Sequence, residues 1–145
     1  MIALIQRVTH AQVVVDNQIT GQIHNGTLAL IGIEKEDNKQ KIEKLAQKIL
    51  NYRIFSDNNG QMNLNLQQIH GGLLLVPQFT LAADTNRGLR PSFSKAAPPN
   101  MAKQLFSDFV NHTKTIYDKI ETGIFGADMQ VSLLNDGPVT FWLQV

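Results

Sequence analysis

Apolar and polar positions alternate along the first third of the chain in a way that predicts three strands. Residues 2–16 are rich in β-branched side chains, and QITGQI (18–23) follows the turn signal DNQ. The run TLALIGIE (27–34) is continuously apolar, which is typical of a strand buried on both faces. Asn25-Gly26 stands between the second and third runs and predicts a hairpin turn.

The apolar period then changes twice to that of an amphipathic helix. The first such segment is 38–53, where Asp37 or Asn38 can serve as the N-cap. The second is 100–117. The residues expected on the apolar faces are Ile42, Leu45, Ala46, Ile49 and Leu50 in the first helix, and Met101, Leu105, Phe109, Ile116 and Tyr117 in the second.

A short apolar run between the helices, residues 73–76, predicts another buried strand. It is ended by Pro77, which cannot donate a ladder hydrogen bond. MQVSLLND and PVTFWLQV near the end of the sequence predict two more strands, joined at Asp136-Gly137. The resulting order β-β-β-α-β-α-β-β predicts one α/β domain over residues 1–145, with a mixed sheet and two main helices.

The composition limits the kinds of functional site and binding partner that the chain can have. The 145 residues are 43% apolar and carry a net charge of +1, so a globular core is feasible and coating of long nucleic acid by charge alone is disfavoured. No cysteine is present, which excludes disulfides and thiolate nucleophiles and is compatible with a reducing cytoplasm. The four histidines show no metal spacing and no nucleotide fingerprint occurs, so we expect neither metal nor cofactor. We also expect no signal peptide and no membrane span.

Basic residues gather in two places that could meet phosphate. One is the first helix, with Lys41, Lys44 and Lys48 on its polar side, although such a face is more often simply solvated. The other is the aperiodic segment 84–99, which holds Arg87, Arg90 and Lys95; loops of this length in compact domains are usually functional or mobile.

Two polar segments interrupt the apolar pattern and are candidates for a site. In PQFTLAAD (77–84), Gln78 and Thr80 could simply satisfy backbone groups where a strand ends. In NDGPVT (135–140), Asp-Gly is an ordinary turn signal, and the Gly137-Pro138 bond can be cis, as ~5% of X-Pro bonds are. Residue spacing alone therefore indicates turns for both segments.

Several motifs together resemble the bacterial D-aminoacyl-tRNA deacylase family across essentially the whole chain. They are QRVT (6–9), NYRIFSD (51–57), MNLN (62–65), QFTLAADT (78–85), RPSFSKAA (90–97) and ADMQVSLLNDGPVTFWLQV (127–145). The resemblance implies a three-layer α/β fold, a homodimer, and hydrolysis of the ester that joins a D-amino acid to the 3′ end of tRNA. It also implies action on glycyl-tRNA, including tRNA-Ala mischarged with glycine.

The resemblance further implies which residues form the site. The family's Gly-cisPro motif matches at Gly137-Pro138 and reaches into the partner subunit's site, where it rejects L-amino acids. Backbone N–H groups near Phe79 would stabilise the oxyanion, and the 2′-OH of the terminal ribose would help activate water. The residues implied as catalytic are Gln78, Phe79 and Thr80, and those implied as substrate-binding are Arg7, Pro77, Met129, Gly137 and Pro138.

One position departs from the family pattern. The Ser-Gln-x-Thr motif has Pro77 in place of its serine, so a serine hydroxyl cannot be the nucleophile here. Thr80 is left as a positioning group or a nucleophile, and the lack of an evident base partner weighs against the second role. Two alternatives follow from this departure: an inactive tRNA-binding homologue, or an ester hydrolase of shifted specificity.

Overall fold

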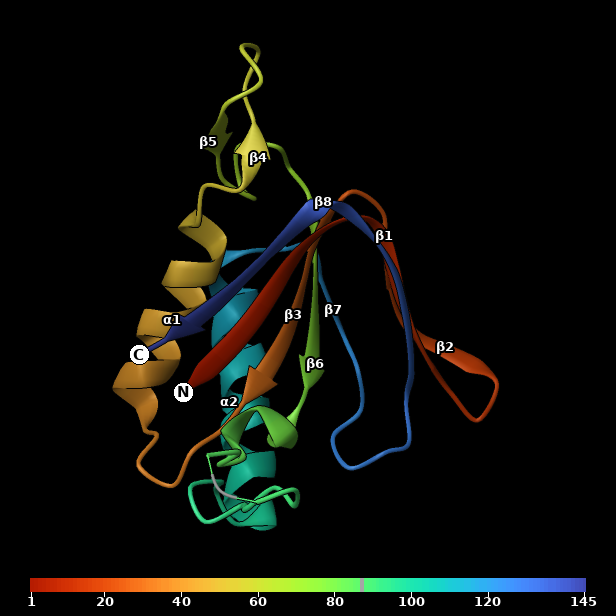
Figure 1. Cartoon of the computed structure of the whole chain (residues 1–145). Coiled ribbons are helices and arrows are strands. Elements are labelled where there is room, and N and C mark those ends of the chain that lie inside the picture. The colour runs from red at the N-terminus through yellow and green to blue at the C-terminus, as the bar shows by residue number, and fades with distance from the viewer. Residues whose placement is uncertain (87) are drawn as a thin grey trace.

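The computed structural model describes residues 1–86 and 88–145; Arg87 of the predicted basic segment lies outside the described residues. In this part of the chain, six strands form one curved mixed sheet, and a two-stranded ribbon projects beside it (Figure 1). The elements are β1 (Ile2–Val15), β2 (Gln18–Ile23), β3 (Gly26–Gly32), α1 (Lys39–Asn51), β4 (Phe55–Ser56), β5 (Met62–Leu64), β6 (Gly72–Pro77), the 3₁₀ turn η1 (Phe79–Ala82), α2 (Pro99–Ile116), β7 (Ile120–Thr122) and β8 (Gln130–Gln144).

The long strand β1 organises the sheet. Its first half pairs antiparallel with β3 and its second half with β2, while β8 runs antiparallel along its other edge. From β3 the sheet continues through β6 to β7, and both of these pairings are parallel. The α/β class, the mixed sheet and the two helices predicted from the sequence are therefore confirmed.

Two predicted hairpins are wrong, and both errors trace to the length of β1. Asn25-Gly26 does not join a paired β2 and β3, because each of them pairs with its own half of β1. Gly26 instead lies against Gly72 of β6, and a Cβ at Gly26 would collide with the Gly72 carbonyl. MQVSLLND and PVTFWLQV form the single strand β8, because both segments pair with β1.

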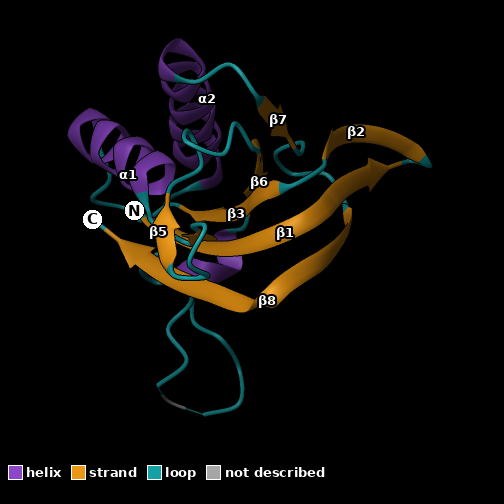
Figure 2. Ribbon diagram, turned by 90° about the horizontal axis from the view of Figure 1, so that it is seen from above, coloured by secondary structure: helices purple, strands orange, loops and turns teal. Residues whose placement is uncertain are grey.

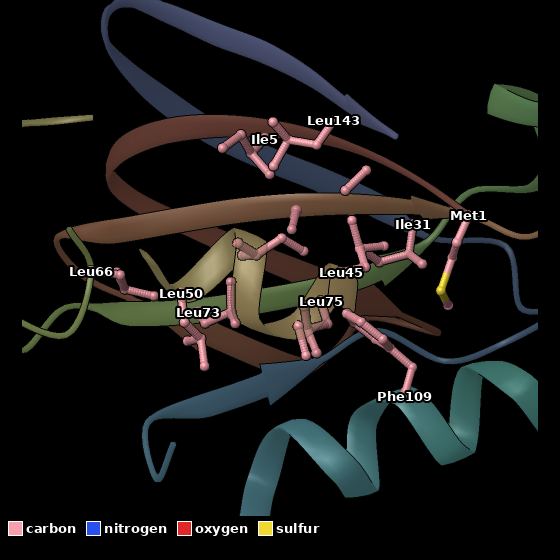
Figure 3. Packing of buried hydrophobic residues seen from close by; sticks show 14 of the residues in the cluster. Met1, Ile5, Ile31, Leu45, Leu50, Leu66, Leu73, Leu75, Phe109 and Leu143 are labelled. Atoms are coloured by element: carbon pink, nitrogen blue, oxygen red, sulfur yellow. The ribbon is translucent and has the colours of Figure 1, made fainter. Parts of the chain in front are cut away.

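Two apolar clusters lie on opposite faces of the sheet. One is packed between the sheet and the helices, where Phe109 extends from α2 toward Leu75 (Figure 3). The other lies between β3 and β6 and the curled second half of β1 with β2. The helices, the central strands and the curled strands make three layers.

The helix faces were predicted with unequal success. In α1 the five predicted apolar residues are all buried, and the Asn38 side chain is the cap, accepting from the Lys41 N–H at 3.2 Å. In α2 Phe109 is buried as predicted, and Leu105, Ile116 and Tyr117 are partly buried against the core. The buried face also includes Ala102, Phe106 and Thr113, which were not predicted. Thr113 tolerates burial because its hydroxyl donates to the Phe109 carbonyl at 2.6 Å.

The two faces of the sheet are covered differently. Both helices lie on one side, and the segment that leads from η1 to α2 projects on the other (Figure 2). No helix among the described residues is long and apolar enough to cross a membrane.

Candidate active site

The end of β6 explains how a proline fits into a central strand. Pro77 pairs with Ile31 of β3, and the next residue, Gln78, donates its N–H to the Ile31 carbonyl at 2.8 Å. On the other side of β6, the last residue of β7 is Thr122, which pairs with Leu75. Pro77 therefore lies beyond the end of β7, and its missing N–H leaves no ladder acceptor of β7 unpaired.

Backbone donors become available directly after this proline. The chain turns at Gln78 (φ −140°, ψ 81°) into η1, whose first residues are Phe79 and Thr80. Within the described part of the chain, no acceptor takes a hydrogen bond from the N–H of Phe79 or Thr80, as expected at a helix start. Both residues are exposed, so these two adjacent N–H groups are candidates for binding a ligand.

The Thr80 hydroxyl is held by its neighbour. The Gln78 side-chain amide donates a hydrogen bond to Thr80 Oγ1, which leaves the hydroxyl proton free to be donated elsewhere. No histidine or carboxylate of the described residues accepts a hydrogen bond from this hydroxyl. The geometry suits a positioning group better than a base-activated nucleophile.

A pocket of about 440 Å³ opens beside η1, between the end of β6, the start of α2 and the loop after β7. It brings together four residues that the sequence pointed to: Pro77, Gln78, Phe79 and Met129. Its walls are mainly apolar. The remaining lining residues are Val76, Ala97, Pro99, Ala102, Phe125, Gly126, Ala127 and Val131.

Gly137 and Pro138 form a bulge in β8, and the peptide bond between them is cis. The ladder skips across it, because Gln6 pairs with Thr140 whereas Val8 pairs with Asn135. Asn135 closes the bulge: its Oδ1 accepts from the Val139 N–H at 2.8 Å, and its Nδ2 donates to the Val139 carbonyl at 3.0 Å. The sequence offered no signal that distinguished Asn135 from an ordinary turn residue.

Arg7 fastens this bulge to the rest of the molecule. Its Nε donates to the Asp136 carbonyl at 2.8 Å and lies 3.1 Å from Asp136 Oδ2. Its Nη1 donates to the carbonyl of Ile54, just before β4, at 2.8 Å. The Arg7 side chain is only 13% exposed, so the guanidinium is a largely buried link between the bulge and the β4–β5 ribbon.

Within one chain, however, the bulge and the pocket are far apart. Arg7, at the level of the bulge, pairs with Thr27, which pairs with Leu73, four residues before Pro77 on β6. Four residues span about 13 Å along a strand, and the three strand spacings from β8 to β6 span about 14 Å, so the separation is roughly 20 Å. The two halves of the predicted site do not meet in a single subunit.

An apolar strip on the sheet connects the edge strand to the pocket. Trp142 of β8 pairs with Leu4, Leu4 with Leu30, and Leu30 with Val76, so the four side chains lie in one row on one face. Val76 lines the pocket, while Trp142 at the other end is 51% exposed. This face is the one turned away from α1 and α2, whose core contacts include Ile31 and Leu75 on the opposite face.

A second aromatic residue accompanies Phe79. The Phe93 ring lies with its centroid 5.1 Å from that of Phe79, at an interplanar angle of 45°. Phe93 is part of the RPSFSKAA motif, but nothing in the residue pattern placed it beside η1, since the segment has no periodicity.

Comparison with known proteins finds relatives over the whole chain. A family described as D-Tyr-tRNA(Tyr) deacylase matches residues 4–144. Proteins named D-aminoacyl-tRNA deacylase from Shewanella sp. (strain W3-18-1) and Shewanella amazonensis (strain ATCC BAA-1098 / SB2B) are 63% and 60% identical to this chain over 145 residues, covering 100% of both sequences in each case.

Solved structures share the fold. One described as "c-Myc DNA Unwinding Element Binding Protein" superposes with a TM-score of 0.96 at 36% identity, covering 100% of this chain and 99% of its own. Another, described as a probable eukaryotic D-amino acid tRNA deacylase, has a TM-score of 0.80 at 14% identity, with 99% and 98% coverage. The match over nearly the whole length shows that the chain belongs to the D-Tyr-tRNA(Tyr) deacylase family, a family of hydrolases.

Proposed function

We propose that the chain hydrolyses D-aminoacyl-tRNA in the cytoplasm at a site shared by two subunits. The pocket and η1 of one subunit would receive the 3′ end of the tRNA, and the partner's Gly137 and the partner's Pro138 would read the chirality of the amino acid. The observation that carries this proposal is the separation of roughly 20 Å between bulge and pocket in one chain.

The exposed strip on the sheet supports a homodimer. Trp142 of β8, at the outer end of this strip, is 51% exposed, so the apolar row continues onto an open surface that a partner could cover. Two copies related by a two-fold axis would cover the strip, and the same axis would carry each bulge toward the other copy's pocket. Dimerisation therefore supplies both burial of the strip and completion of two sites.

The pocket suits the terminal adenosine of tRNA. Unpaired bases are commonly held by stacking on aromatic side chains, and Phe79 and Met129 line an otherwise apolar wall. With the adenosine in the pocket, the ester carbonyl would lie near the start of η1. The free N–H groups of Phe79 and Thr80 are then available to stabilise the oxyanion of the tetrahedral intermediate.

The reaction needs few side chains, because an aminoacyl ester is already activated. Water adds to the ester carbonyl carbon, and the terminal 2′-OH of the tRNA relays its proton. The bond to the ribose oxygen then breaks, that oxygen is protonated, and a free D-amino acid and tRNA leave. Thr80, held by the Gln78 amide, positions water or substrate without acting as the nucleophile.

Chirality would be read by backbone groups of the partner. The carbonyl oxygens of the partner's Gly137 and the partner's Pro138 accept hydrogen bonds from the substrate α-ammonium and leave no room for an L side chain. Glycine has no side chain to exclude, so glycyl-tRNA, including glycine mischarged on tRNA-Ala, is also a substrate.

The first test is deacylation of D-Tyr-tRNA and L-Tyr-tRNA by the purified protein. We expect release of D-tyrosine well above the uncatalysed rate and no acceleration for the L-ester. Release from both would support the hydrolase of shifted specificity. Release from neither, with tRNA still bound, would support the inactive binding homologue. The description of one solved relative likewise names binding of a nucleic acid.

The second test replaces the terminal 2′-OH of the tRNA with hydrogen. We expect turnover to be abolished while binding of the tRNA persists. Unchanged turnover would refute assistance by the RNA hydroxyl and leave only the backbone groups of η1.

A further inference from the structure

Phe93 is an aromatic residue beside the pocket that has no role in the proposed site. Its ring lies against Phe79, yet Phe93 is not among the residues that line the pocket. Phe79 is 59% exposed and Phe93 40% exposed, so both rings keep accessible surface. The two residues, called here the aromatic pair, extend an aromatic surface outward from the pocket.

The backbone around Phe93 is fixed although its side chain is exposed. Asp84 and Ser92 exchange two hydrogen bonds, from the Asp84 N–H to the Ser92 carbonyl at 2.7 Å and from the Ser92 N–H to the Asp84 carbonyl at 3.0 Å. The Phe93 carbonyl accepts from the Ala96 N–H at 3.0 Å. These hydrogen bonds fix the backbone on both sides of Phe93, while its ring packs against Phe79 and stays partly exposed.

The charges near Phe93 favour an anionic ligand. Arg90 is exposed and forms no ion pair with any described residue. Lys95 is 63% exposed, and its Nζ is 3.8 Å from Asp84 Oδ2, a loose contact that leaves the ammonium accessible. Exposed aromatic rings beside exposed cations are the usual means of holding single-stranded nucleic acid, by base stacking and phosphate contact together.

We propose that Phe93 stacks on the base of the penultimate nucleotide of the tRNA 3′ end, so that the enzyme grips two unpaired nucleotides rather than one. The inference rests on the proposed function, which puts the terminal adenosine in the pocket next to Phe79. The preceding nucleotide of the tRNA would then lie outside the pocket, next to the aromatic pair. Phe93 is a binding residue of the substrate's RNA part and touches no reacting atom.

The experiment compares substrates that differ by one nucleotide. Wild type and Phe93→Ala are assayed with a D-tyrosyl ester of adenosine alone, with the same ester on a cytidylyl-adenosine dinucleotide, and with D-Tyr-tRNA. Loss of one stacked base lowers kcat/KM roughly 10- to 100-fold for the two longer substrates. The one-nucleotide substrate should change by less than about 2-fold, and Phe93→Trp should retain activity on all three.

Several outcomes would overturn the proposal. An equal loss on all three substrates would mean that Phe93 only supports Phe79 and η1. No loss on any substrate would mean that the ring has no role in turnover. Dissociation of the Phe93→Ala dimer, measured by sedimentation, would assign the ring to the partner subunit's surface.

Two controls separate this inference from the proposed function. Wild-type turnover of D-Tyr-tRNA tests the proposed function by itself, and only the ratio of variant to wild type bears on Phe93. Binding of uncharged tRNA gives a readout without catalysis: we expect Phe93→Ala to weaken it by about 10-fold, and unchanged binding would contradict stacking.

Discussion

Arg7 offers a quantitative test of how the Gly137-Pro138 bulge is held. Replacing Arg7 by alanine removes the hydrogen bonds to the carbonyls of Asp136 and Ile54, both at 2.8 Å. It also removes the 3.1 Å ion pair to Asp136 Oδ2. The bulge would then be tied to the rest of the chain chiefly through β8 and Asn135.

The magnitude follows from the exposure of each partner. Hydrogen bonds from a charged donor are worth about 1.5–3 kcal/mol each, so the two carbonyl bonds together contribute at least about 3 kcal/mol. The Asp136 carboxylate is 50% exposed, so its ion pair adds at most about 1 kcal/mol. If the full loss of about 3 kcal/mol raises the free energy of the transition state, kcat/KM for D-Tyr-tRNA falls by roughly 100-fold.

The assay is single-turnover deacylation of D-Tyr-tRNA by Arg7→Ala, with two companion variants. Asp136→Asn keeps both carbonyl acceptors and should lower kcat/KM by less than about 5-fold. Arg53→Ala is the matched control. Among the residues that the structure describes, Arg53 donates only to Asn63 of β5, so its loss should leave kcat/KM within about 3-fold of wild type. A loss of less than 5-fold for Arg7→Ala, or an equal loss for Asp136→Asn, would refute the reasoning.

Three further predictions test the strand end, the core and the ribbon. Pro77→Ser should change kcat/KM by less than about 5-fold, and a gain of several hundredfold, ~3–4 kcal/mol in barrier, would show that the missing serine mattered. Phe109→Ala should lower the free energy of unfolding in urea by about 3–5 kcal/mol, because Phe109 is fully buried; a loss under 1 kcal/mol would contradict that packing. Hydrogen bonds from the Asn63 amide and, to a smaller extent, from the Gln61 N–H lower the pKa of the Asp57 carboxyl. The ionised Asp57 carboxylate therefore stabilises the fold at neutral pH, and this stabilisation is lost as pH falls through the lowered pKa. Carbon NMR titration should show this pKa rising toward its ordinary value in Asn63→Ala.

Local patterns predicted the elements whose burial is set by their own periodicity. The stripe of α1 from Ile42 to Leu50 was predicted residue by residue, and so was the buried strand before Pro77. The two wrong hairpin predictions have another cause, which is the pairing of strands that are distant in sequence. Asn25-Gly26 and Asp136-Gly137 both have turn chemistry, but which strands pair was decided by β1, which is long enough to hold β3 and β2 in succession. Pairing of that kind depends on contacts that no short window contains.

The features of the site likewise fall into those that local motifs indicated and those that they did not. Gln78, Phe79 and Met129 were pointed to by family motifs, and the fold brings them to one pocket. The sequence did not indicate that Phe93 lies on Phe79, or that Arg7 reaches the Ile54 carbonyl, because these contacts join segments with no shared pattern. The separation of bulge and pocket could be worked out only once the strand register was known.

The most direct test of the shared site is complementation between two defective subunits. Ala127→Trp fills the pocket from the loop after β7. Gly137→Ala disturbs the bulge, because its Cβ would lie 2.8 Å from Val139 Cγ2 and would also collide with the Val139 backbone nitrogen. Each variant alone should be inactive on D-Tyr-tRNA while remaining dimeric.

Mixed subunits distinguish the two arrangements of the site. After equal amounts of the two variants are unfolded and refolded together, half of the dimers carry one subunit of each kind. If the pocket of one subunit works with the partner's Gly137, each mixed dimer has one intact site, and the mixture recovers about a quarter of wild-type deacylation. If each chain forms its own site, the mixture stays inactive, and that result would contradict the account.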